Sequence, residues 1–118
     1  MSYVDGYVLP IPEKSLETYR EMAQKAGEIW MEHGALAYKE CVGEDLYPEW
    51  ASGSFPKGAG AEGGETVIFA FITFKSREHR DEVNAKVHQD PRLQCDMENL
   101  PFDCKRMIYG GFTTLVDL

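Results

Sequence analysis

The start of the chain alternates in a way that predicts a β-strand over residues 3–9, because successive side chains of a strand point to opposite faces. The two faces carry Val4, Gly6 and Val8 on one side, and Tyr3, Asp5, Tyr7 and Leu9 on the other. Proline fixes its own backbone angle and lacks an amide hydrogen, so Pro10 and Pro12 are predicted to end this strand.

A different period follows over residues 13–33, where apolar side chains recur every three or four positions and predict a long amphipathic helix. The apolar stripe consists of Leu16, Tyr19, Ala23, Ala26 and Trp30, widened by Met22 and Ile29. Gly34 is predicted to stop the helix, since glycine readily takes the left-handed conformation found there.

The rest of the chain predicts three more strands and one more helix. The strands are expected at residues 35–42, 66–74 and 106–116, and the helix at residues 77–89, where Ser76 is a suitable N-cap and Asp90-Pro91 a stop. Residues 92–105 are expected to be irregular. The strand at 66–74 is apolar on both faces, which predicts that both faces are buried.

The predicted order is β-α-β-β-α-β in a single α+β domain spanning residues 1–118, which is the ferredoxin-like arrangement with a four-stranded antiparallel sheet. Two helices cover only one face of such a sheet, whereas the strand at 66–74 requires cover on both. We therefore expect a homodimer, a dimeric α/β barrel in which two sheets pack together around a cavity.

Residues 43–65 form a long Gly- and Pro-rich loop in which no helical or alternating period is visible. Such connections are typical of a lid, an interface arm or disorder. From Glu40 to Glu65 the chain has six acidic residues and one lysine, and the aromatic residues Tyr47, Trp50 and Phe55 are expected to anchor the loop. The GxGxxG match at residues 58–63 precedes a strand rather than a helix, so a flexible linker is favoured over a nucleotide site.

The formal net charge of −8 argues against binding to DNA, RNA or an acidic membrane surface. The three cysteines, Cys41, Cys95 and Cys104, do not form a CxxC pair and are interpreted as free thiols, which together with the absence of an apolar leader predicts a cytoplasmic protein. The three histidines lack the spacing of a metal site, and neither a metal nor another cofactor is expected. Whether Cys41 is reactive depends on its neighbours in space.

The candidate site follows from the first strand. Gly6 would allow a helix to pack closely, so Val4, Gly6 and Val8 are expected to face the helices, and Tyr3, Asp5 and Tyr7 the cavity. The candidate catalytic residues are Asp5, Glu40 and Arg106, and the candidate ligand-binding residues are Tyr3, Tyr7, Phe69, Phe71 and Tyr109. A second interpretation stays open, in which Asp5 and Glu40 form ion pairs with Arg106 or Lys39 at a sheet end.

Several strings give the chain a resemblance that covers nearly its whole length. The most specific block is Lys105-Arg106-Met107-Ile108-Tyr109-Gly110-Gly111-Phe112, and the others include Tyr3-Val4-Asp5-Gly6-Tyr7-Val8, Tyr19-Arg20-Glu21-Met22-Ala23, Gly34-Ala35-Leu36, Glu40-Cys41, Asp90-Pro91-Arg92 and Pro101-Phe102-Asp103. In these strings the chain resembles the YbaA-like family of uncharacterised bacterial proteins. The resemblance implies a ferredoxin-like dimeric α/β barrel and implies no activity.

Three functions remain open at this stage. The first is a homodimer that binds a small molecule in a cavity at the sheet face. The second is a cofactor-independent oxygenase or isomerase, by analogy with other dimeric α/β barrels. The third is a non-catalytic interaction module that uses its acidic loop against a basic partner.

Overall fold

The computed structural model describes residues 2–93 and 103–118 and contains four strands and three α-helices within these ranges. The elements are β1 (Tyr3–Pro12), α1 (Leu16–Glu32), β2 (Ala37–Val42), α2 (Phe55–Ala59), β3 (Glu65–Phe74), α3 (Arg77–Gln89) and β4 (Ile108–Thr113), with short 3-10 helices at Glu13–Ser15, Pro91–Leu93 and Cys104–Arg106. The α+β class predicted from the sequence is confirmed.

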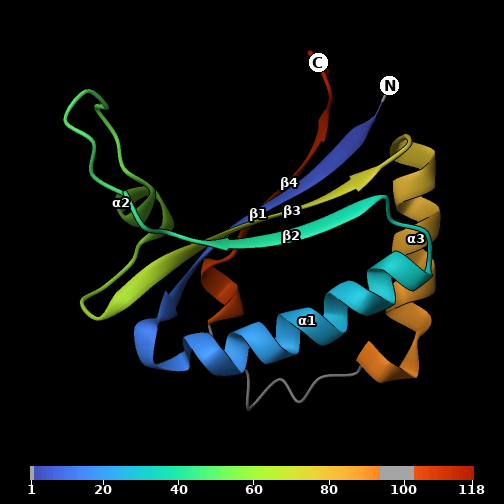
Figure 1. Cartoon of the computed structure of the whole chain (residues 1–118), viewed down its shortest axis with the longest axis horizontal. Helices are drawn as coiled ribbons and strands as arrows, with labels where there is room; N and C mark the ends of the chain where they lie inside the picture. Colours follow the sequence, from blue (N-terminus) through green and yellow to red (C-terminus); the bar gives the residue numbers. More distant parts are fainter. Residues whose placement is uncertain (1, 94–102) are drawn as a thin grey trace.

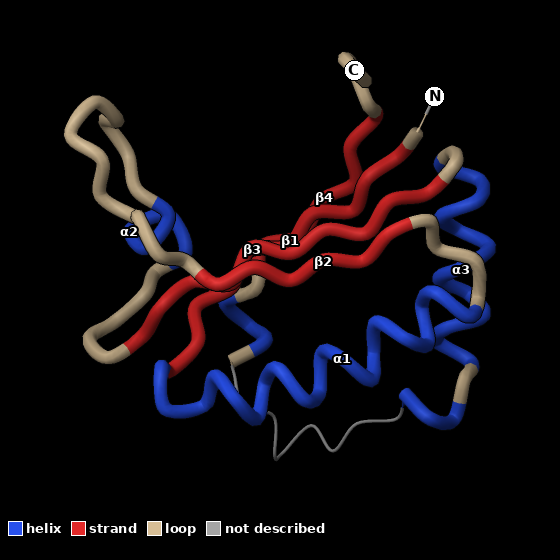
Figure 2. The backbone as a smooth tube through the Cα atoms, viewed as in Figure 1, coloured by secondary structure: helices blue, strands red, loops and turns tan. Residues whose placement is uncertain are grey.

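The strands form one sheet in the order β2-β3-β1-β4, and every neighbouring pair is antiparallel. The helices α1 and α3 lie together on one face of this sheet, and α2 lies beyond the opposite face (Figure 1). In Figure 2 the strands lie above α1, and α3 runs beside their right-hand ends. We call the helix-covered side the inner face and the opposite side the outer face.

The hydrophobic core fills the space between the inner face and the two long helices. One cluster joins Tyr3, Ile72 and Phe74 of the sheet to Ile29 of α1 and to Val83 and Val87 of α3. A second cluster joins Leu9, Ile11, Ile68 and Ala70 of the sheet to Tyr19 and Ala23 of α1. Burial of these side chains is what attaches the helices to the sheet.

The sidedness predicted for the first strand is wrong. Tyr3, Asp5 and Tyr7 belong to the inner face, where Tyr3 and Tyr7 pack on the helix clusters and Asp5 binds Arg80 of α3. Gly6 is indeed closely approached, but by an aromatic ring of the neighbouring strand, because an added Cβ would lie 3.3 Å from Cε1 of Phe112.

Strand β1 continues past the predicted end at Leu9 and through Pro10, and it ends at Pro12. Pro10 and Pro12 pair with Val67 and Glu65 of β3, and the pairing of β1 with β4 stops at Val8. The prolines therefore lie where β1 has lost its second neighbour, and an edge strand tolerates a missing amide hydrogen. The helical segment then begins as a 3-10 turn before α1 starts at Leu16.

Other predicted boundaries hold to different degrees. The helix at 77–89 agrees with α3, and β3 begins one residue earlier than predicted. Both β2 and β4 are shorter than predicted, at residues 37–42 and 108–113. The predicted irregular stretch 92–105 lies largely outside the described residues, and its ends fall in the two 3-10 turns.

The connection from residue 43 to residue 64, called the arm below, contains the helix α2 that the sequence analysis did not predict. The side chain of Ser54 accepts a hydrogen bond from the amide of Lys57 and caps the helix N-terminus, and Gly60 ends it with a left-handed φ of 71°. Phe55 stacks on Phe69 of β3 with ring centroids 6.1 Å apart, so this aromatic residue anchors the arm as expected. Tyr47 and Trp50, expected to do the same, are 73% and 89% exposed in this chain. Within the described ranges, no helix is long and apolar enough to cross a bilayer.

Helix α1 approaches the sheet most closely at Gly27, which faces the ring of Tyr38 in β2. An added Cβ at Gly27 would lie 2.6 Å from Cδ1 of Tyr38, which is closer than two carbons can pack. At Gly58, inside α2, no atom lies within 4 Å of the corresponding position.

We predict opposite effects for alanine at these two helical glycines. Alanine raises helix propensity by about 1 kcal/mol, which is expected to stabilise Gly58→Ala. In Gly27→Ala the overlap with Tyr38 outweighs that gain and lowers the free energy of unfolding by about 1–3 kcal/mol. Urea unfolding followed by circular dichroism measures both, and a Gly27→Ala variant as stable as the parent would contradict the close packing.

Candidate functional site

A row of residues crosses the inner face of the sheet, one from each strand. In the strand register, Glu40 of β2 lies opposite Ala70 of β3, Ala70 lies opposite Tyr7 of β1, and Tyr7 lies opposite Tyr109 of β4. Three predicted site residues are thus aligned beneath the helices.

Next to this row, α1 and β2 enclose a groove of about 840 Å³, called the α1–β2 groove below. Its walls include Tyr19, Ala23 and Gly27 from α1, Tyr38 and Glu40 from β2, and Ile68 from β3. The approach of α1 to β2 at Gly27 brings the two tyrosines to opposite sides of Glu40. The groove lies on the helix-covered side of the sheet, not at the sheet-to-sheet cavity where the sequence analysis expected the site.

Glu40 is the polar centre of the groove. The hydroxyl of Tyr19 donates to Oε1 and the hydroxyl of Tyr38 donates to Oε2, the latter at 2.5 Å. Burial, followed by the charge of Glu40, raises the pKa of both tyrosines well above the usual value, so both remain protonated donors. Among the residues that the structure describes, Glu40 has no ion-pair partner.

Asp5 is held in a separate network that attaches α3 to the sheet. Its carboxylate is fully buried and accepts hydrogen bonds from Arg80 at 2.7 Å and from Asn84 at 3.5 Å. Arg80 also donates to the hydroxyl of Tyr109 at 2.6 Å, and its guanidinium lies 5.0 Å from the ring centroid of Tyr3. Asp5 is therefore enclosed and already paired with a cation, which makes it a poor candidate for proton transfer with a ligand.

Asn84 extends this network to α1, because its side-chain oxygen accepts a hydrogen bond from the indole of Trp30 at 3.1 Å. The alternative interpretation from the sequence, an ion pair of Asp5, is correct in kind, but the partner is Arg80 and not Arg106 or Lys39. The sequence did not indicate Arg80, because it lies 75 positions from Asp5 on a separate element.

Within the described residues, Arg106 forms no hydrogen bond with Asp5 or Glu40, the other two catalytic candidates. It binds Glu65 at the base of the arm instead. Its two terminal nitrogens donate to the two carboxylate oxygens at 2.8 and 2.7 Å, and one of them also reaches the carbonyl of Gly60 at 3.1 Å. The hydrogen bonds from Arg106, together with one from the amide of Glu62, lower the pKa of Glu65 to about 2.

Phe69 and Phe71, two predicted ligand-binding residues, lie on the outer face, away from the tyrosines. Their ring centroids are 5.9 Å apart, and the arm covers part of this face. A second hollow of about 410 Å³ lies between the arm and the outer face, lined by residues that include Val8, Leu46, Trp50, Phe55 and Ile108. The predicted ligand set is thus divided between the two faces.

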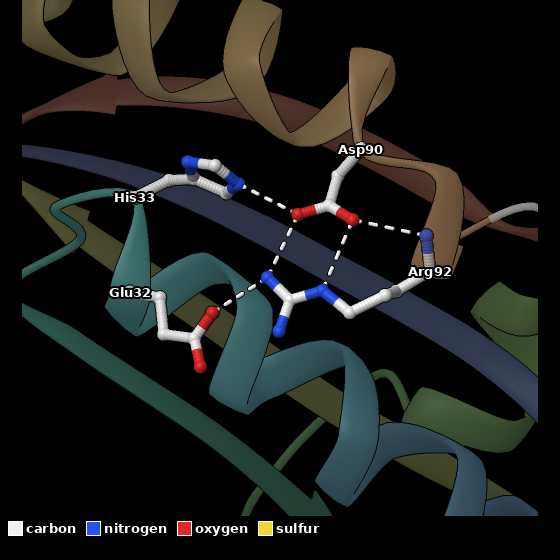
Figure 3. A network of polar contacts seen from close by, with 4 residues as sticks. All are labelled: Glu32, His33, Asp90 and Arg92. Carbon is white, nitrogen blue, oxygen red and sulfur yellow. Dashed lines mark hydrogen bonds and ion pairs between the residues drawn. The ribbon is translucent and has the colours of Figure 1, made fainter.

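A further polar cluster joins the C-terminal end of α1 to the segment after α3 (Figure 3). Asp90 accepts from Nε2 of His33 at 2.9 Å and from the guanidinium of Arg92 at 2.8 and 3.1 Å, and Arg92 also donates to Glu32 at 2.5 Å. The hydrogen bonds from Arg92, and then that from His33, lower the pKa of Asp90. All four side chains are used in joining two helix ends, which indicates a structural role.

Within the described residues, the cysteines and the possible metal ligands do not form a second candidate site. Cys41 is exposed on edge strand β2, where its position belongs to the outer face and the residue also borders the α1–β2 groove. Cys104 is partly exposed, both cysteines are free thiols, and Cys95 lies outside the described residues. Within residues 2–93 and 103–118, no three His, Cys, Asp or Glu side chains come together as a metal site would require. The sequence signals that could have identified the groove are Tyr19 in the apolar stripe and Tyr38 two positions before Glu40.

The pairing of Arg106 with Glu65 predicts a specific pH dependence. The pKa of Glu65 is lower in the folded chain, about 2, than its ordinary value of 4.5, so its contribution to stability is present above pH 4.5 and is lost as the pH falls towards 2. Arg106→Gln is expected to raise the carboxyl midpoint of Glu65 towards 4.5 in an NMR titration and to destabilise the protein at neutral pH more than near pH 2.

Arg20→Gln serves as the control, since Arg20 pairs with the exposed Glu17 of its own helix and, within the described residues, makes no ion pair with Glu65. It should leave the titration of Glu65 unchanged. A midpoint for Glu65 that is the same with and without Arg106 would show that this ion pair does not form in solution.

Comparison with known proteins assigns the chain to a family. A family model described as "Protein of unknown function (DUF1428)" matches residues 2–104. The chain is 44% identical over 117 residues to "Uncharacterized protein YbaA" of Escherichia coli strain K12, with 99% of each chain covered, and equally similar to the protein of that name from Shigella flexneri. Among solved structures, the de novo designed protein Foldit4 aligns over 97% of this chain and 99% of its own, with a TM-score of 0.49 and 10% identity. The resemblance to YbaA-like proteins is thus confirmed, and the chain belongs to the DUF1428 family of proteins of unknown function.

Proposed function

We propose that this protein binds a small organic molecule in the α1–β2 groove, with Glu40 as the polar anchor, and that it does so as a homodimer. The observation that carries the proposal is a carboxylate held by two tyrosine hydroxyls in a groove with apolar and aromatic walls and a charged rim. Binding sites for small molecules commonly combine an apolar wall with a few polar groups that fix the orientation of the ligand.

The dimensions of the groove agree with this function. Small-molecule sites usually measure roughly 300–1,000 Å³, and the groove measures about 840 Å³. The surrounding scaffold is rigid, because Asp5 with Arg80 and Asp90 with His33 and Arg92 tie the helices to the sheet and to each other. A preorganised wall of this kind lowers the entropy lost on binding.

The dimer part of the proposal rests on the outer face. Phe69, Ile108 and Phe112 expose 42%, 51% and 60% of their surface there, and Val4, Val8 and Phe71 are partly exposed beside them. Such a contiguous apolar surface marks an interface in a protein that stays in solution. The strand order β2-β3-β1-β4 supports a ferredoxin-like arrangement, in which two outer faces pack together as a dimeric α/β barrel.

A second copy of the chain is the partner that the charges favour. Lys39 is the one charged residue on the central part of the outer face. This part comprises the outward positions of β3 from Val67 to Thr73 and the residues paired with them on the neighbouring strands. The remaining surface of a chain with a net charge of −8 repels another copy, whereas this face does not. A two-fold axis through it would bring identical apolar patches together.

Glu40 also supports a cofactor-independent enzyme of the oxygenase or isomerase kind as a second candidate. A carboxylate that faces a groove is suitable to accept a proton from a bound substrate, and the two tyrosines would hold it in position. In that case Glu40→Gln abolishes turnover. The third function, binding of a basic partner by the acidic segment, has less support, because Glu40 faces the groove and Glu65 is neutralised by Arg106.

We predict that small aromatic fragments bind in the groove and depend on Glu40. In a fragment library screened by NMR, hits are expected to shift the amide signals of Gly27, Tyr38 and Cys41. Glu40→Gln removes a charged acceptor and is expected to weaken these hits at least about tenfold. The matched control Glu78→Gln, on the exposed surface of α3, should bind as the parent does.

Two results would contradict this function. Hits that shift Val8 and Ile108 and leave α1 unchanged would move the site to the hollow under the arm. Hits in the groove that bind Glu40→Gln and the parent equally well would show that Glu40 is not the anchor.

A further inference from the structure

We infer that the α1–β2 groove selects a ligand with a positively charged group on an apolar body, of which a protonated organic amine is the simplest case. The inference rests on the proposed function and adds the chemical class of the ligand. It is carried by the combination of an unneutralised carboxylate, the charges on the rim and the aromatic walls.

The carboxylate of Glu40, on the floor of the groove, accepts hydrogen bonds but forms no ion pair within the described residues. Tyr19 and Tyr38 each donate one hydrogen bond to Glu40, but phenols are neutral and leave its negative charge in place. No lysine, arginine or histidine in the described parts of the chain lies within ion-pair distance of this carboxylate. Asp5, the other inner-face carboxylate, has such a cation in Arg80 at 2.7 Å.

The rim adds negative charge in excess of positive charge. Four carboxylates line the groove, Glu17, Glu28, Glu32 and Glu40, against a single cation, Arg20. Arg20 forms an ion pair with Glu17, with nitrogen and oxygen 2.5 Å apart. Glu32 forms one of the same length with Arg92, which lies outside the groove. Glu28 and Glu40 are therefore left without a cationic partner among the described residues. An anionic ligand would be repelled, and a cation would be attracted.

The walls suit the apolar part of such a ligand. Ala23, Ile68 and Val42 present aliphatic surface, and Tyr38 presents an aromatic ring. The face of an aromatic ring attracts organic cations through its quadrupole, and the attraction grows as the cation loses water. An ammonium group near Glu40 would thus be stabilised by the carboxylate and by the ring.

Three probes of similar size and different charge test this inference. They are 2-phenylethylamine, a cation at neutral pH, 2-phenylethanol, which is neutral, and phenylacetate, an anion. Dissociation constants are measured from the amide shifts of Gly27 and Cys41 in the parent, Glu40→Gln, Glu28→Gln and the control Glu78→Gln.

In the parent, the amine is expected to bind at least about tenfold more tightly than the alcohol, and phenylacetate more weakly than either. Glu40→Gln should abolish the preference for the amine while the alcohol still binds, and Glu28→Gln should reduce the preference only in part. Added salt should weaken the amine and leave the alcohol unchanged, a readout that does not depend on any variant folding.

The outcomes separate this inference from the proposed function. Equal binding of amine and alcohol in the groove, or a preference for the amine that persists in Glu40→Gln, would overturn the cationic ligand and leave the groove as the site. If none of the three probes and no library fragment shifts the groove signals, both proposals fail.

Discussion

The arrangement of this protein depends on the need to neutralise one buried charge. Asp5 is completely enclosed, and an unpaired carboxylate there would cost several kcal/mol. Its partner, Arg80, belongs to α3, so α3 must lie on the face of the sheet that carries Asp5. Strand alternation then assigns Tyr3, Tyr7 and Leu9 to the same face, and the register extends that face to Glu40 in β2 and Tyr109 in β4. The ion pair and the apolar clusters of the same face together determine which side chains face the helices.

The two faces of the sheet consequently differ in chemistry. The inner face combines an apolar core with carboxylates and tyrosines, and it contains the α1–β2 groove, whose walls come from elements that meet tightly at Gly27. The central part of the outer face, from Val67 to Thr73 and their paired neighbours, has aromatic and aliphatic side chains with Lys39 as its one charge, and the arm covers one part of the face through Phe55. We propose that ligand binding belongs to the inner face and assembly to the outer face.

Local sequence patterns predicted the elements better than their relations in space. The bounds of α3 followed from Ser76 and from Asp90-Pro91, and the apolar run of β3 was unambiguous. The helix α2 was missed because five residues that include a glycine and a proline show no period. The sidedness of β1 was predicted wrongly because Gly6 was given more weight than Asp5. The sequence of the strand does not indicate that Asp5 pairs with Arg80. The same limit applied to Arg106, whose partner Glu65 lies 41 positions away. Glu40, Tyr7 and Tyr109 do lie on one face, but only the register between the strands shows this, because alternation within a strand does not relate it to its neighbours.

The central claim is that two copies assemble through the outer face. It is tested most directly by the native mass of the untagged protein and of its Phe71→Asp variant. Phe71 is only partly buried in one chain, so the substitution should leave the monomer folded, and it should place a carboxylate inside the proposed interface. We expect the parent to have twice the chain mass of 13.4 kDa, and so should the control Ala85→Asp on the exposed side of α3. A folded Phe71→Asp variant should have the mass of one chain, 13.4 kDa. A parent of 13.4 kDa, or a Phe71→Asp variant that still assembles, would contradict the claim.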